Sequence, residues 1–144
     1  MKPVSVCMAL LLAACGGGVG GSGTIVSEHV SNQSFDQQTA SGLRVRWDFG
    51  AHQPSADLMD QWFQEAKACS DRTGPPERAG IPVPPPLIVI VAPGTNDPFD
   101  GVTYYFFATI LIEAEWENDR SLYIHEFVRW ILFVRGVSPH DQIT

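Results

Sequence analysis

Residues 87–91, LIVIV, constrain the fold more than any other segment of the chain. A continuous run of apolar, mostly β-branched residues is typical of a strand that is buried on both faces. The preceding segment, residues 70–86, is rich in proline, which lacks an amide donor and fixes an extended backbone. We therefore expect a surface loop that leads into a central strand of a sheet.

A second strand is predicted over residues 43–49, LRVRWDF, because apolar and charged side chains alternate there. Strict alternation indicates one buried face and one exposed face. The residues expected to point into the core are Leu43, Val45, Trp47 and Phe49, and those expected to point away are Arg44, Arg46 and Asp48.

Between these strands, Ser55 is a suitable N-cap for a helix that runs to Cys69. Leu58, Trp62, Ala66 and Cys69 recur at helical spacing and should form the stripe that lies on the sheet. The other two cysteines, Cys7 and Cys15, lie in the N-terminal segment whose signal-peptide and lipid-attachment features are described below. The sequence therefore predicts that Cys69 has no disulfide partner and packs as a small hydrophobic side chain rather than acting as a reactive thiol.

The C-terminal third predicts more sheet and a final helix. Residues 102–116 suit one long strand, or a short strand followed by a second one near residues 109–114. A helix over residues 121–135 should be capped by Asn118 or Asp119 and ended by Gly136. We expect a small α+β domain over residues 42–144, with a mixed sheet of three to four strands packed against two main helices.

The N-terminus has the composition of a secretory signal, with Lys2, an apolar run and small residues that end at Cys15. Leu12-Ala13-Ala14-Cys15 resembles the lipobox of bacterial lipoproteins, which implies a signal peptide over residues 1–14 and acylation of Cys15. The alternative is an ordinary cleaved signal with an incidental cysteine. Residues 15–41 are glycine-rich and then polar, which predicts a flexible tether, with a possible edge strand at residues 24–26.

Charge limits the partners that the chain can bind. The formal net charge is -7 at pH 7, and no basic patch is visible. Such a domain is a poor candidate for nucleic-acid binding. The expected partner is instead a membrane, bound through the lipid on Cys15, with an envelope protein or peptide as a further ligand.

The final predicted helix contains His125-Glu126 and, three residues later, Arg129. With histidine at position 129 this would be the His-Glu-x-x-His signature, in which two imidazoles on one helix face hold Zn²⁺ and the glutamate acts as general base. A guanidinium has no lone pair for a metal and stays protonated. Arg129 therefore cannot supply the second ligand.

The order of predicted elements, the His-Glu helix and the later pair His140-Asp141 resemble the core half of the zincin metallopeptidase fold over residues 43–142. The resemblance implies an edge strand beside the signature helix. It also implies that His125 is the first metal ligand, Glu126 the base and His140 a third ligand. Arg129 departs from the family pattern.

We therefore expect a lipid-anchored protein of the bacterial cell envelope, in the outer membrane if Gly16 after the lipid site is a guide. Its zincin-like domain is expected to be catalytically inactive, to need no cofactor and to act as a binding or structural module. One alternative is an active zinc metallopeptidase that uses His125, Glu126 and His140, with Asp141 as substitute ligand. Another is an unrelated α+β lipoprotein in which Glu126 and Arg129 merely form a surface ion pair.

Overall fold

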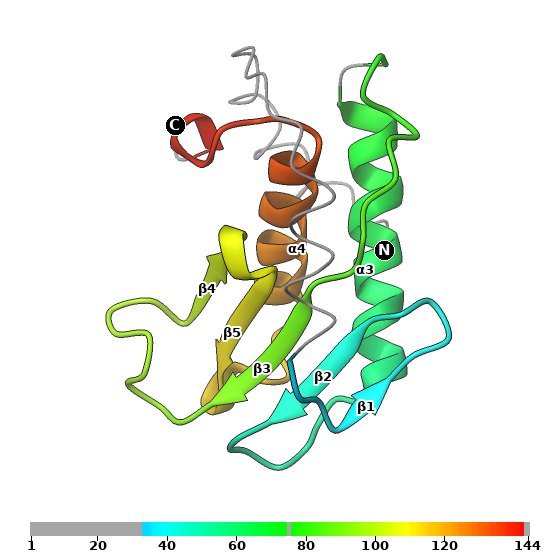
Figure 1. The fold of residues 1–144 in the computed structure, drawn as a ribbon. Coiled ribbons are helices and arrows are strands. Elements are labelled where there is room, and N and C mark those ends of the chain that lie inside the picture. Colours follow the sequence, from blue (N-terminus) through cyan, green and yellow to red (C-terminus); the bar gives the residue numbers. More distant parts are fainter. Residues whose placement is uncertain (1–32, 75, 143–144) are drawn as a thin grey trace.

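A computed structural model describes residues 33–74 and 76–142 (Figure 1). The signal peptide, Cys15 and the possible strand at residues 24–26 lie outside these residues. The strands are β1 (Gln37–Gln38), β2 (Arg44–Trp47), β3 (Leu87–Val91), β4 (Gly101–Tyr104) and β5 (Thr109–Glu113). The helices are α3 (Ala56–Thr73) and α4 (Arg120–Val134), with short 3-10 turns η1 (Tyr105–Phe107), η2 (Ala114–Trp116) and η3 (Pro139–Gln142).

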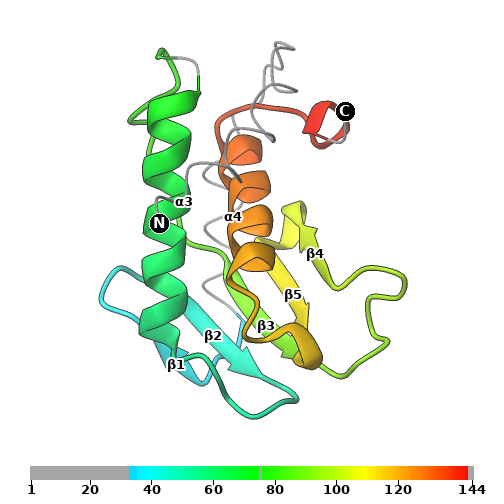
Figure 2. The same cartoon turned by 180° about the vertical axis from the view of Figure 1, so that it is seen from behind.

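The strands form one mixed sheet in the order β1-β2-β3-β5-β4. β2, β3 and β5 are parallel, and β1 and β4 pair antiparallel at the two edges. Both helices cover the same face of the sheet, as the two opposite views show (Figures 1 and 2). The predicted α+β domain with a mixed sheet and two main helices is confirmed. The sheet has five strands rather than three or four, because β1 adds an edge and residues 101–113 form two strands.

β3 is buried along its whole length, as its composition predicts. Ile88 and Ile90 join the core beneath the helices. Leu87, Val89 and Val91 form a separate cluster with Leu111 on the other face of the sheet. The central position of β3 therefore places one set of its alternating side chains in each of two apolar clusters.

Two side chains that were expected in the core are exposed. Phe49 is 52% exposed, because β2 ends at Trp47 and the amides of both Asp48 and Phe49 donate to the Ile90 carbonyl. That shared acceptor breaks the alternation of the strand. Leu58 lies at the margin of the buried stripe of α3, and Met59 occupies the core in its place.

Local capping fixes the helix ends. The Ser55 hydroxyl accepts the Leu58 amide, and the Asp119 carboxylate accepts the amides of Ser121 and Leu122. Gly136 follows α4 with a φ of 88°, a conformation that glycine adopts without strain. The predicted caps at Ser55 and Asp119 and the stop at Gly136 are confirmed.

Aromatic and polar contacts join the two helices to each other and to the loop before β3. The rings of Phe63 and Phe127 meet edge to face at 5.2 Å, and the Trp130 indole donates to the Pro84 carbonyl at 2.8 Å. Near the C-terminal ends of the helices, the buried Arg135 donates to Asp71. Burial acts to raise the pKa of Asp71, but the hydrogen bond and charge of Arg135 outweigh it and lower that pKa.

Cys69 corrects one expectation from the sequence. It lies on the buried side of α3, as predicted, but it is disulfide-bonded. Its partner lies outside the described residues. The expectation was wrong because it removed Cys7 with the signal and assigned Cys15 to a lipid, which left no cysteine for pairing.

Candidate functional site

The His-Glu motif lies in the N-terminal half of α4, where its two side chains have opposite environments. The His125 side chain is 41% exposed, whereas that of Glu126 is 2% exposed. Successive residues of a helix point about 100° apart, so one faces solvent while the next faces the sheet. His125 is therefore open to solvent while Glu126 is enclosed.

The Glu126 carboxylate is held by groups from two elements. Thr103, on edge strand β4, donates its hydroxyl to Glu126 Oε2 in a short hydrogen bond. Arg129 Nη1 lies 3.8 Å from Glu126 Oε1, and His125 Nε2 lies at the same distance from that atom. Glu126 thus acts as a polar link between α4 and β4.

Arg129 is itself fixed by a second polar contact. Its Nε donates to the Tyr105 hydroxyl at 3.2 Å, while a quarter of its side chain remains exposed. Burial raises the pKa of Tyr105, and the neighbouring Arg129 cation opposes that rise. The guanidinium therefore bridges Glu126 and Tyr105. The ion pair between Glu126 and Arg129, which the sequence places at the surface, involves a buried carboxylate.

Gly101 allows this close approach of α4 to β4. A Cβ at this position would lie 3.1 Å from Leu122 Cδ1 and 3.3 Å from Glu126 Cγ. Both distances are tighter than ordinary van der Waals contact, so a side chain at residue 101 would require Leu122 and Glu126 to shift. The absence of a side chain at residue 101 thus helps to bring Glu126 to Thr103.

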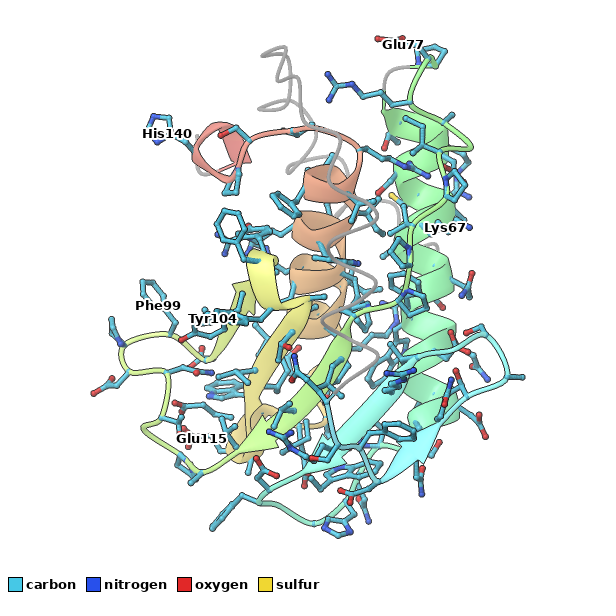
Figure 3. All side chains as sticks on the ribbon, in the orientation of Figure 1. Lys67, Glu77, Phe99, Tyr104, Glu115 and His140 are labelled. Atoms are coloured by element: carbon cyan, nitrogen blue, oxygen red, sulfur yellow. The ribbon has the colours of Figure 1, made fainter. Side chains whose placement is uncertain are left out.

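His140 does not join the motif. It is exposed on η3, beyond the C-terminal end of α4, and Figure 3 shows it pointing away from the domain. At a rise of about 1.5 Å per residue, the helix carries the chain roughly 14 Å from His125 to Val134 before that turn begins. The structure therefore keeps the two histidines apart.

The described residues around the His-Glu motif do not fit a zinc site. Within residues 33–74 and 76–142, no group of three or more His, Cys, Asp or Glu side chains is placed to hold a metal ion. The position of the second ligand holds a cation that is engaged by Glu126 and Tyr105. A shallow hollow of about 500 Å³ lies away from this motif, on the solvent side of α3. Its lining residues are Asp57, Asp60, Gln61, Gln64, Glu65 and Ala68.

Thr103 and Tyr105 were not identified from the sequence. Both lie in VTYYFF, which carries strand propensity but no sign of which helix its side chains will meet. Their contacts with α4 span more than twenty residues of sequence. Only the position of β4 at the sheet edge, beside α4, brings them to the motif.

The fold and this polar network define a small α+β domain whose His-Glu helix is bound to the edge strand of its sheet. Comparison with protein-family models, with curated proteins and with solved structures finds no match to the chain. In the part of the chain that the structure describes, neither helix is both long and apolar enough to cross a membrane.

Proposed function

We propose that the chain is a lipid-anchored protein of the bacterial cell envelope whose zincin-like domain serves as a binding or structural module without zinc catalysis. The observation that carries this proposal is the engagement of Glu126. A general base must reach a metal-bound water with a free lone pair. Here the carboxylate is buried, accepts the Thr103 hydroxyl and faces the Arg129 cation.

Two features support the zincin-like part of the proposal. The helix that carries His125 and Glu126 packs on the sheet, and β4 is an antiparallel edge strand that contacts it through Thr103. This is the arrangement that the resemblance implies, an edge strand beside the signature helix. The contact also gives the motif a structural role, because it fastens α4 to the sheet.

Restoring the second ligand tests the zincin-like ancestry. We expect Arg129→His to raise zinc affinity by at least about tenfold, because a neutral ligand replaces a repelling charge at the fifth position of the signature. Isothermal titration with zinc on the full chain measures the change. The matched control is Arg129→Gln, which removes the charge without adding a ligand. Equal affinities in the two variants would favour an accidental His-Glu pair.

The zinc content of the unmodified chain tests separately whether the domain holds the metal that zinc catalysis would need. After dialysis against zinc, the parent chain should hold less than stoichiometric metal, and His125→Ala should not change that content. Stoichiometric zinc that disappears with His125→Ala would support the alternative, an active metallopeptidase that uses His125, Glu126 and His140.

The anchor has its own test. We expect Cys15→Ser to release the protein from the membrane fraction, because no acyl chain can then be attached at residue 15. Cell fractionation measures the distribution, and Cys7→Ser serves as the control that should stay membrane-bound. Membrane retention of Cys15→Ser would contradict lipid anchoring. Cleavage before Cys15 removes Cys7 and acylation occupies Cys15, so the proposed mature chain cannot keep a disulfide within the chain at Cys69. An intact mass that changes on reduction would therefore contradict acylation of Cys15.

A further inference from the structure

Four aromatic side chains are exposed at one edge of the sheet, and we name this surface the aromatic edge. Phe106 is 79% exposed and Phe107 is 57% exposed, both on η1, which follows β4. Tyr104, the last residue of β4, and Phe99, in the loop before β4, are 44% and 63% exposed. Figure 3 shows Phe99 and Tyr104 on this outer edge of the sheet. Exposed apolar surface of this kind marks a site of interaction.

The aromatic edge is supported from within the domain. The ring of Phe106 meets that of Phe133 on α4 at 6.3 Å, edge to face, and Tyr105 lies 4.8 Å from Phe133 on the inner side. These ring contacts already restrict the rotation of the aromatic side chains. Binding through the aromatic edge therefore costs less conformational entropy than binding through rings on a flexible loop. The exposed rings are thus presented by a packed element.

The N-terminal part of the chain enters the fold beside this surface. The Gln33 side-chain amide donates to the Phe107 carbonyl at 3.2 Å and to Thr109 Oγ1 at 3.4 Å. Gln33 is the first described residue, so the segment that leads back to Cys15 departs next to η1. The glycine-rich composition of residues 15–32 predicts a tether with a typical end-to-end distance of about 23 Å.

We propose that the aromatic edge rests on the lipid bilayer that holds the anchor, with its rings at the level of the headgroups. This inference rests on the proposed lipid anchor at Cys15. Because the tether ends beside Phe107, an anchored chain holds these rings at a high effective concentration near the lipid, and a weak contact then suffices. Aromatic rings favour the interface between lipid and water.

The charges around the surface specify the lipid. Asp97 and Asp100 are exposed on either side of Phe99, and the formal net charge of the chain is -7. Anionic headgroups would repel this surface, so the matching bilayer is zwitterionic. The other occupant that β4 could take is a second copy of the chain, paired at the open strand edge.

A fluorescence experiment on the full lipidated chain tests the proposal. The chain is reconstituted into phosphatidylcholine vesicles whose acyl chains carry bromine, a quencher of tryptophan emission. We expect Phe106→Trp to add emission that brominated lipid lowers roughly twofold relative to unbrominated lipid. The control is Phe49→Trp. Strands β2 and β5 run in the same direction, so Phe49, after the end of β2, and η1, before the start of β5, lie at opposite ends of the sheet. Emission added at residue 49 should not change.

The outcomes separate this inference from the proposed anchor. A chain that floats with the vesicles but shows no quenching at residue 106 keeps the anchor and overturns the bilayer contact. The same result with a dimeric mass in detergent would assign the aromatic edge to a second copy. A chain that fails to float, as Cys15→Ser is expected to do, would contradict the anchor itself and with it the bilayer contact.

Discussion

Trp130→Ala is expected to lower the free energy of unfolding by about 4 kcal/mol, the largest effect of any substitution considered for this domain. The Trp130 side chain is fully buried on α4, where its ring lies 5.9 Å from Phe133. Its indole also donates to the Pro84 carbonyl, which fixes the proline-rich loop just before β3. Alanine leaves a large cavity and removes that hydrogen bond. Urea unfolding followed by circular dichroism measures the loss.

Trp116→Ala is the matched control for this prediction. Trp116 lies on η2 and is 38% exposed, so its truncation should cost less than about 1 kcal/mol. Trp130→Phe keeps a ring but loses the donor and part of the volume, so we expect an intermediate cost of about 2 kcal/mol. Equal losses at residues 116 and 130 would show that α4 does not form the core as described.

Thr103→Val is expected to cost about 2 kcal/mol, because it preserves shape while it leaves a buried carboxylate without its hydroxyl donor. Thr103 is 7% exposed and Glu126 is 2% exposed, so water cannot easily replace the lost contact. Thr109→Val provides the control, since Thr109 is equally buried but donates to the neutral Phe107 carbonyl. That change should cost about 1 kcal/mol.

A double-mutant cycle shows whether the carboxylate is the partner of Thr103. In a Glu126→Gln background the hydrogen bond becomes neutral, and Thr103→Val should cost about 1 kcal/mol less than in the parent chain. Strictly additive costs would mean that Glu126 is not held by Thr103. The proposed lack of catalysis would then rest only on the burial of Glu126 and on the Arg129 cation beside it.

The parts of the fold that the sequence predicts are those set by local chemistry. The run at residues 87–91 identifies the central strand because any position with two covered faces needs apolar side chains on both. Ser55 and Gly136 mark helix ends because capping and positive φ depend on a single residue. These features need no knowledge of distant parts of the chain.

The parts that the sequence did not predict depend on contacts between distant segments. β1 consists of Gln37 and Gln38, which have no strand signature and pair with β2 only because its edge is open. The motif at His125 was recognised, yet its surroundings were not, because Thr103 and Tyr105 reach it through the position of β4. The sequence shows that Arg129 replaces the second histidine of the signature. Only the fold shows that Glu126 is buried and held by Thr103.

The contact between Thr103 and Glu126 also bears on how this domain could acquire hydrolytic chemistry. Histidine at position 129 would supply a second imidazole, but the Glu126 carboxylate would still accept the hydroxyl of Thr103. The carboxylate would also stay buried and oriented toward β4, which limits its reach to water on a newly bound metal. We therefore expect efficient hydrolysis to require changes on both α4 and β4, and not the substitution at residue 129 alone.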